Sequence, residues 1–250
     1  ISILAGLQKF NLKACKDQQA QDCYSTTFSL AYNYYKAYQN KAPTAAPGFV
    51  AYNQNSGAYI FKPSNDTISS SLLYTTPTSG TIYVGKNLVQ IRIESNNVNT
   101  DIRIYNDLAL GLEVNTFVNS ISVADKQGKE IILLVNTPSI NNNKTFYTDS
   151  MGMEMQKRIL NYRPTWNVAI DEPVSGNYYP VQSTIYIEDS KTQERLAVLP
   201  DRAQGGSSIN QGSIELMIHR RLILDDARGV EENLNELDWD GQGMRQKMTH

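Results

Sequence analysis

The sequence has too few histidines and cysteines for most metal and redox chemistry. Its 250 residues include two of each. A catalytic zinc site usually has about three side-chain ligands with His among them, whereas this chain offers only His219 and the terminal His250. We therefore expect no metal ligand within this chain. Cys15 and Cys23 have seven residues between them, which matches neither the CxxC spacing of redox motifs nor that of zinc ribbons.

Charge of one sign and long apolar runs are also missing. Lys and Arg number 23 against 25 Asp and Glu, which gives a net charge of −2 without a basic block. Electrostatic capture of nucleic acid or of an anionic membrane is therefore disfavoured. The best apolar run, residues 131–135, falls far short of the roughly 18 to 20 residues that a membrane helix needs. We expect a soluble protein with no nucleic-acid partner and no membrane span.

The start of the chain and its N-x-T triplets point to a piece of a longer, secreted protein. The chain opens on Ile1 with neither a start Met nor a secretory signal. Asn65 and Asn143 each begin a sequon, and glycosylation there would imply the secretory route. In that oxidising route Cys15 and Cys23 would form a disulfide. Free thiols, and chance sequons in an Asn-rich chain, are the alternatives.

Strand patterns dominate from about residue 50. In residues 88–94 the polar Gln90, Arg92 and Glu94 alternate with apolar residues, which is the pattern of a strand with one buried face. Further short strands are expected at residues 80–84, 102–105, 108–114, 131–135, 184–187, 196–199 and 214–218. Such spacing favours a mainly β fold, an antiparallel β-sandwich.

Residues 1–45 form an N-terminal segment that these patterns leave unassigned, and residues 46–250 are expected to form the sandwich domain. A helix is expected near the start of the chain. An aromatic stretch follows, made of Tyr32, Tyr34, Tyr35 and Tyr38. We interpret these tyrosines as packed strand residues rather than as a platform on which sugars stack. Residues 43–48 are typical of a loop, and residues 151–161 have the propensity of a helix.

Most catalytic motifs fail on this sequence. His219 stands in a strand-like run, where a packed or surface His is expected rather than the base of a Ser-His-Asp arrangement. There is no GxSxG elbow and no GxxxxGK[ST] phosphate loop. Carboxylates remain, and a glycosidase needs only two of them. The candidates in loop-like surroundings are Asp149, Glu154, Glu172, Asp201, Asp225 and Asp226. Because most carboxylates are solvated surface charges, the pattern selects no pair among them.

Four long segments in a fixed order carry a more specific signal. They are QNSGAYIFKP at residues 54–63, FYTDSMGMEMQKRILNYRPTW at 146–166, EPVSGNYYPVQSTIYIED at 172–189 and LPDRAQGGSSINQGSIELMIHRRLILDDARGVEENLNE at 199–236. Together they closely resemble the C-terminal half of class II α-mannosidases, family 38 of the glycoside hydrolases, and most of all the lysosomal branch.

The resemblance implies a zinc-dependent, retaining exo-α-mannosidase that trims mannose from N-linked glycans in a lysosome or another secretory-pathway compartment. In that family the nucleophile, the general acid and the zinc ligands belong mainly to an N-terminal α/β barrel, which is not among these residues. This chain would be the β-rich part, similar to the sandwich of galactose-mutarotase-like domains. It would pack against the catalytic barrel of the same protein and border the active site, with no catalytic residue of its own and no activity alone.

Three residues have the chemistry to contact a sugar at that border: Tyr59, Arg202 and Gln204. Aromatic faces and planar hydrogen-bonding groups suit a mannose ring, which shows patches of C–H beside its hydroxyls. The alternating run around Tyr59 alone favours a core aromatic, whereas the resemblance implies that Tyr59 and Arg202 reach the pocket edge. The charged stretch HRRLILDDARG, residues 219–229, is expected to form an ion-paired network that holds a loop or the barrel interface.

Two other functions stay open on the sequence. One is a non-catalytic carbohydrate-binding or structural β-sandwich module. The other is a stand-alone mutarotase-like enzyme acting on free sugars, which would need His219 and a carboxylate that face each other.

Overall fold

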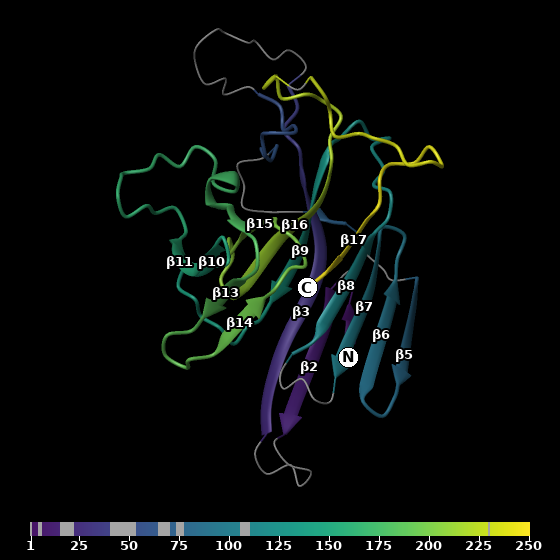
Figure 1. Ribbon diagram of the computed structural model, residues 1–250, viewed down its shortest axis with the longest axis vertical. Helices are drawn as coiled ribbons and strands as arrows, with labels where there is room; N and C mark the ends of the chain where they lie inside the picture. Colours follow the sequence, from purple (N-terminus) through teal and green to yellow (C-terminus); the bar gives the residue numbers. More distant parts are fainter. Residues whose placement is uncertain are drawn as a thin grey trace.

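The computed structural model describes residues 2–4, 7–15, 23–40, 54–64, 71–73, 78–105, 111–229 and 231–250. In these residues the chain folds into three antiparallel β-sheets (Figure 1). The single helical turn in the described ranges is η1 (Ser175–Asn177). The expected mainly β sandwich is therefore confirmed. None of the described segments is a helix long and apolar enough to cross a membrane.

The largest sheet has eight strands among the described residues. Its order is β1 (Ser2–Leu4), β2 (Leu7–Cys15), β3 (Cys23–Lys36), β9 (Lys129–Asn136), β16 (Ser213–Arg221), β15 (Gln204–Ser207) and β12 (Tyr179–Val181), with β4 (Ser71–Leu72) paired to β3. The five-stranded sheet has the order β17 (Gln246–Thr249), β8 (Glu113–Val118), β7 (Val98–Tyr105), β6 (Leu88–Glu94) and β5 (Ser79–Val84). The four-stranded sheet has the order β11 (Glu154–Ile159), β10 (Thr145–Ser150), β13 (Ile185–Glu188) and β14 (Arg195–Val198).

Strand β9 lies at the centre of the eight-stranded sheet, between β3 and β16. Its side chains are buried on both faces of the sheet. Ile131 and Leu133 belong to the main core, whereas Ile132 and Leu134 belong to a smaller second core. A continuous apolar run is the pattern expected of a strand that is covered on both sides. We call the two sides of this sheet the main-core face and the second-core face.

The main core lies between the eight-stranded sheet and the two smaller sheets. Leu133 and Leu216 contribute from the large sheet, Ile102 from the five-stranded sheet, and Phe146 and Ile185 from the four-stranded sheet. Burial of each such side chain contributes roughly 1.5–3 kcal/mol. Both smaller sheets therefore pack on the main-core face, which leaves the second-core face to loops.

Most of the expected strands are present, with shifted ends. Residues 88–94 form β6 and alternate between buried and exposed in its second half, as expected. The strand expected at residues 108–114 was placed too early, because β8 begins at Glu113, and residues 106–110 lie outside the described residues. The loop expected at residues 43–48 lies outside them too. Tyr32 and Tyr35 are buried in β3, which confirms that they are packed strand residues.

Both expected helices are wrong. The start of the chain forms strands, and β2 pairs with β3 along its whole length. Residues 151–161 form the turn and second strand of a hairpin, in which Ser150 pairs with Glu154. Met151 and Gly152 have positive φ angles of 52° and 71°, and the Asp149 carboxylate accepts the Gly152 N–H at 2.8 Å. This capped turn and the pairing with β10 override the helical propensity of the segment.

A buried hydroxyl cluster joins two sheets inside the main core. The Tyr32 hydroxyl, on β3, lies 2.9 Å from the Thr116 hydroxyl of β8 and accepts a hydrogen bond of 2.9 Å from the Thr100 hydroxyl of β7. All three residues are buried. Because buried polar groups are costly without partners, the three hydroxyls fix the position of the five-stranded sheet on the eight-stranded one.

The substitution Tyr32→Phe keeps the ring and leaves the two threonine hydroxyls without this partner. We expect it to lower the free energy of unfolding by about 1–2 kcal/mol, measured by urea denaturation. Tyr83→Phe, on the exposed strand β5, is the control and should change stability little. Equal effects of the two substitutions would contradict the proposed role of the cluster.

Candidate functional site

The loop at residues 56–61, which we call the Tyr59 loop, presents its tyrosine to solvent. Tyr59 is 67% exposed, so the interpretation of this residue as a core aromatic is wrong. The loop is nevertheless fixed at its end, because Phe61 packs against the second core and its ring meets that of Tyr178 edge-on at 4.9 Å. The loop thus covers part of the second-core face while Tyr59 points outward.

Asp226 holds N–H groups in the backbone of the Tyr59 loop. Its Oδ2 accepts the N–H groups of Tyr59 at 2.7 Å and of Ile60 at 3.0 Å, and its Oδ1 accepts the Arg228 N–H at 3.2 Å. Asp226 is buried, with 1% of its surface exposed. A Cβ on Gly57 would lie 2.6 Å from the Asp226 Cβ, so only glycine at position 57 permits this approach.

Arg220 holds carbonyl groups of the same backbone. Its Nη2 donates to the carbonyl oxygens of Gly57 and Ile60, each at 2.8 Å. Its Nε donates to Oε2 of Glu130 at 2.5 Å. Glu130 is fully buried on the central strand β9 and also accepts a hydrogen bond from the Ser56 hydroxyl. The expected network is present only in part: Arg220 forms an ion pair with Glu130, whereas Asp226 holds the loop through backbone N–H groups. The loop that they hold is the one that carries Tyr59.

A β-bulge sets the direction of Arg220. The register of β16 against β9 shifts between Met217 and His219. Leu216 and Ile218 contribute to the main core, and simple alternation would place Arg220 on that face too. The bulge instead pairs Arg220 with Glu130, whose strand neighbour on the same side, Ile132, belongs to the second core. One extra residue thus turns the guanidinium toward the Tyr59 loop.

Glu215 is a second buried carboxylate on the second-core face. It accepts hydrogen bonds from the hydroxyls of Tyr35 at 3.0 Å and of Tyr178 at 2.6 Å. Burial raises the pKa of Glu215 to about 7, against the opposing effect of the two hydroxyls. Glu130 and Glu215 were not predicted as site residues from the sequence. A charged residue at the start or in the middle of an apolar strand run could have indicated a buried carboxylate with hydrogen-bond partners.

Arg202 and Gln204 lie together against β17. Arg202 forms an ion pair with Asp201, with its Nε 2.9 Å from Oδ1, and donates from Nη2 to the Lys247 carbonyl at 2.7 Å. This pairing lowers the pKa of Asp201. Oε1 of Gln204 lies 3.1 Å from Nε2 of His250. Half of the Arg202 side chain is exposed. The Gln204 amide instead contacts Met248 and His250.

Tyr59 and the Arg202 region lie at the same end of the eight-stranded sheet but on opposite faces. β15 runs antiparallel to β16, so Gln204 at its start lies at the end where β16 reaches Arg220. Gln204 alternates with Gly206, which pairs with the main-core residue Leu216. In Figure 1 the segment that directly follows β16 and the segment at residues 54–64 lie beyond this end of the sheet. A ligand would have to reach over the sheet end to touch both faces.

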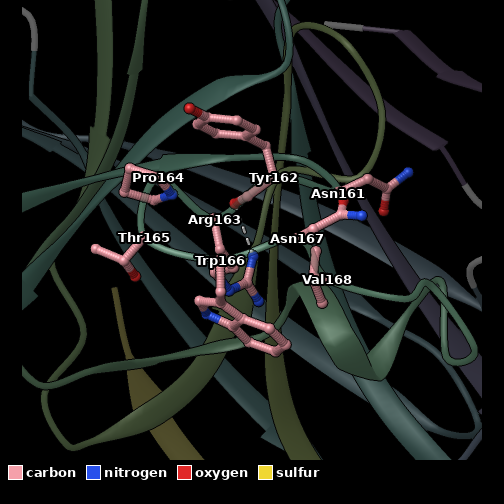
Figure 2. Close-up of a pocket in the computed structure, with 8 residues that line it drawn as sticks. All are labelled: Asn161, Tyr162, Arg163, Pro164, Thr165, Trp166, Asn167 and Val168. Carbon is pink, nitrogen blue, oxygen red and sulfur yellow. Dashed lines mark hydrogen bonds between the residues drawn. The ribbon is translucent and has the colours of Figure 1, made fainter.

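A hollow outside this region is lined by residues 161–168 only. Figure 2 shows that all of its lining belongs to one continuous segment, with the Tyr162 and Trp166 rings pointing in different directions. The Arg163 guanidinium is already hydrogen-bonded there, since it donates to the carbonyl of Gly176 at 2.6 Å. The lining holds no carboxylate, histidine or cysteine, which are the commonest acids, bases and metal ligands.

The other candidate residues have structural contacts. Asp149 accepts four backbone N–H groups, and although burial opposes it, these donors lower its pKa. His219 contacts the Met244 carbonyl at 3.1 Å, and burial lowers its pKa. Among the described residues, no group of three or more His, Cys, Asp or Glu gathers in a way that could hold a metal ion.

The predicted modification sites are placed only in part. Asn143 lies in an exposed turn before β10, and Asn65 lies outside the described residues. Cys15 and Cys23 are directly opposed in the register of β2 and β3. Opposed residues in an antiparallel pair have Cα atoms about 4.5–5.5 Å apart, within the range of a disulfide. The disulfide and both glycosylation sites stay predictions.

The chain matches the glycosyl hydrolases family 38 C-terminal domain over residues 15–228, a span that starts within the N-terminal segment left unassigned above. It is 41% identical over 208 residues to a probable alpha-mannosidase of Arabidopsis thaliana, with 82% of this chain and 19% of that protein covered. It is 44% identical over 200 residues to a lysosomal alpha-mannosidase of Bos taurus, with coverages of 79% and 19%. For the lysosomal alpha-mannosidase of Homo sapiens the identity is 53% over 125 residues, with coverages of 50% and 12%.

The match places the chain among the glycoside hydrolases. Within them it belongs to family 38 and carries the C-terminal domain of that family. The resemblance on the four sequence segments is therefore confirmed. The chain spans about a fifth of the length of the curated relatives from Arabidopsis thaliana and Bos taurus.

Glu215 should make the domain more stable in acid. Its pKa in the folded protein, about 7, lies above the ordinary value of 4.5, so the folded state holds the proton more tightly. This contribution is complete below about pH 4.5 and is lost as pH rises through 7, and it amounts to about 3 kcal/mol. Glu215→Gln should remove this pH dependence.

The measurement is the urea midpoint of unfolding at pH 5 and at pH 8, compared between the wild type and Glu215→Gln. Glu154→Gln, at an exposed position on β11, is the matched control and should keep the wild-type pH dependence. If the urea midpoint changes equally between pH 5 and pH 8 in the wild type and in Glu215→Gln, Glu215 does not titrate in this range.

Proposed function

We propose that this chain is the part of a zinc-dependent, retaining exo-α-mannosidase that borders the active site without supplying its catalytic groups. The observation that carries the proposal is the family 38 C-terminal domain, in which an exposed Tyr59 stands on a loop held by buried charges. The full-length protein would trim mannose from N-linked glycans.

Catalysis and zinc binding are assigned to a barrel of the same protein that lies outside these residues. Among the residues that the structure describes, no cluster of side chains suits a zinc ion. The buried carboxylates Glu130 and Glu215 do not suit the two catalytic roles either, because both are sealed beneath loops and hydrogen-bonded to Ser56, Tyr35 and Tyr178.

The substrate edge is assigned to Tyr59, Arg202 and Gln204. The exposed Tyr59 ring can lie against the C–H face of a sugar. The exposed part of the Arg202 guanidinium keeps N–H groups free for sugar hydroxyls, because the fork has five donors. Gln204 would act mainly by placing the turn that precedes β15, since its own amide faces Met248 and His250.

The protein is proposed to mature in a lysosome or another compartment of the secretory pathway. The relatives named above include lysosomal enzymes. The opposed cysteines of β2 and β3 and the exposed Asn143 suit an oxidising, glycosylating route. The stability in acid that we expect from Glu215 also suits such a compartment.

Arg202→Ala in the full-length enzyme should lower kcat/KM on an aryl α-mannoside roughly five- to tenfold, because one hydrogen bond to a sugar hydroxyl is worth about 1 kcal/mol or somewhat more. Its thermal midpoint should change little. Arg195→Ala, on an exposed ion pair with Glu188, is the matched control and should leave kcat/KM unchanged. A loss of kcat/KM shared by both variants, or one that follows the thermal midpoint, would overturn the assignment of Arg202.

The purified 250-residue chain alone should hydrolyse no aryl α-mannoside and hold no stoichiometric zinc by elemental analysis. The full-length protein should hydrolyse it and lose that activity on chelation of zinc. Hydrolysis by the chain alone, after removal of contaminating enzyme, would contradict the proposal. A full-length protein that binds mannosides without cleaving them would favour the non-catalytic carbohydrate-binding module instead.

A further inference from the structure

We propose that Asp226 and Arg220 are positioning residues, which place Tyr59 at the substrate edge by clamping the backbone on both sides of it. Glu130 orients the Arg220 half of this clamp. The inference rests on the proposed function, in which Tyr59 contacts the sugar. It goes further because it assigns a role in substrate binding to two residues that reach the sugar only through Tyr59.

The clamp acts on the peptide groups that flank Tyr59 and leaves the side chain alone. Asp226 takes the N–H groups of Tyr59 and Ile60, and Arg220 takes the carbonyls of Gly57 and Ile60. Tyr59 itself remains 67% exposed. A loop whose only task was to cover the second core would not need a fixed backbone around an exposed aromatic. This arrangement is instead that of a binding group held in advance of its ligand.

The charges of the clamp match the groups that they hold. A carboxylate accepts the N–H groups and a guanidinium donates to the carbonyls, and charged partners make the stronger hydrogen bonds. Both side chains are largely buried, with Asp226 1% exposed and the Arg220 side chain 19% exposed. Water therefore competes little for these contacts, and the backbone of the loop has one preferred place.

The clamp is tied to the buried central strand of the eight-stranded sheet. Arg220 is fixed by Glu130, which is fully buried on the central strand β9. Asp226 follows on the same segment, beyond the end of β16. Gly57 closes the arrangement, since the place of its missing Cβ is filled by Asp226. Tyr59 is thereby linked to the centre of the eight-stranded sheet through two side chains.

The test is a double-mutant cycle in the full-length enzyme with an aryl α-mannoside. Asp226→Asn replaces the charged acceptor with a neutral amide, whose NH2 group must face at least one of the three N–H groups, so its hold on the loop weakens. Arg220→Lys keeps a charge for Glu130 but loses the planar fork that reaches the loop carbonyls. Each should raise KM, by roughly three- to tenfold, with a smaller change in kcat. In a Tyr59→Ala background neither should raise KM further, since its effect passes through Tyr59.

Asp189→Asn is the matched control. Asp189 is also a buried aspartate whose carboxylate accepts backbone N–H groups, those of Asn141, Lys191 and Thr192, and it lies by the four-stranded sheet. It should change the thermal midpoint as Asp226→Asn does and leave KM unchanged.

The outcomes separate this inference from the proposed function. If Tyr59→Ala leaves KM and kcat unchanged, Tyr59 is not at the substrate edge and the assignment under the proposed function fails. If Tyr59→Ala raises KM but the clamp variants raise it equally with and without Tyr59, or not at all, the clamp does not act through Tyr59 and the present inference is overturned.

Discussion

The ion pair between Glu130 and Arg220 is the interaction on which the candidate edge depends. Both charges leave water, and such a pair is stable only when the remaining donors and acceptors are satisfied. Here the Tyr59 loop satisfies them, with the Ser56 hydroxyl on the carboxylate and the Gly57 and Ile60 carbonyls on the guanidinium. The loop and the ion pair therefore stabilise each other. Removal of one partner of a buried pair commonly costs about 3–5 kcal/mol, so neither charge is replaceable by itself.

The sandwich itself was largely predictable from the sequence. Alternation in residues 88–94 predicted a strand with one buried face, and the apolar run at residues 131–135 predicted a strand. That the second strand is buried on both faces emerged from the fold, in which it faces two cores. Residues 151–161 could not be predicted in this way. Their helical propensity is local, whereas the pairing with β10 and the Asp149 carboxylate that caps the turn are contacts made by the fold.

The candidate site was predictable in its residue types and not in its geometry. The SGAY and DRAQG segments indicated Tyr59 and Arg202, yet period two alone favoured a core position for Tyr59. The bulge before His219 reverses the face of Arg220 and has no signature in the residues themselves. Glu130 and Glu215 were missed because their hydrogen-bond partners, such as Tyr35 and Tyr178, come from distant segments. The family resemblance pointed to the exposed residues Tyr59 and Arg202, whereas the contacts that hold the Tyr59 loop are seen only in the fold.

The Tyr59 loop depends on anchors that lie far along the chain. Arg220 and Asp226 follow Gly57 and Tyr59 by more than 160 residues. Because a ribosome makes the chain from its N-terminus, the loop leaves the ribosome long before either anchor exists, and contacts of such separation close late. In the hairpins of the five-stranded sheet each strand pairs with one that lies within a few tens of residues, so these hairpins can form as soon as both strands have been made. The Tyr59 loop is therefore among the last parts of the domain to take its shape during synthesis.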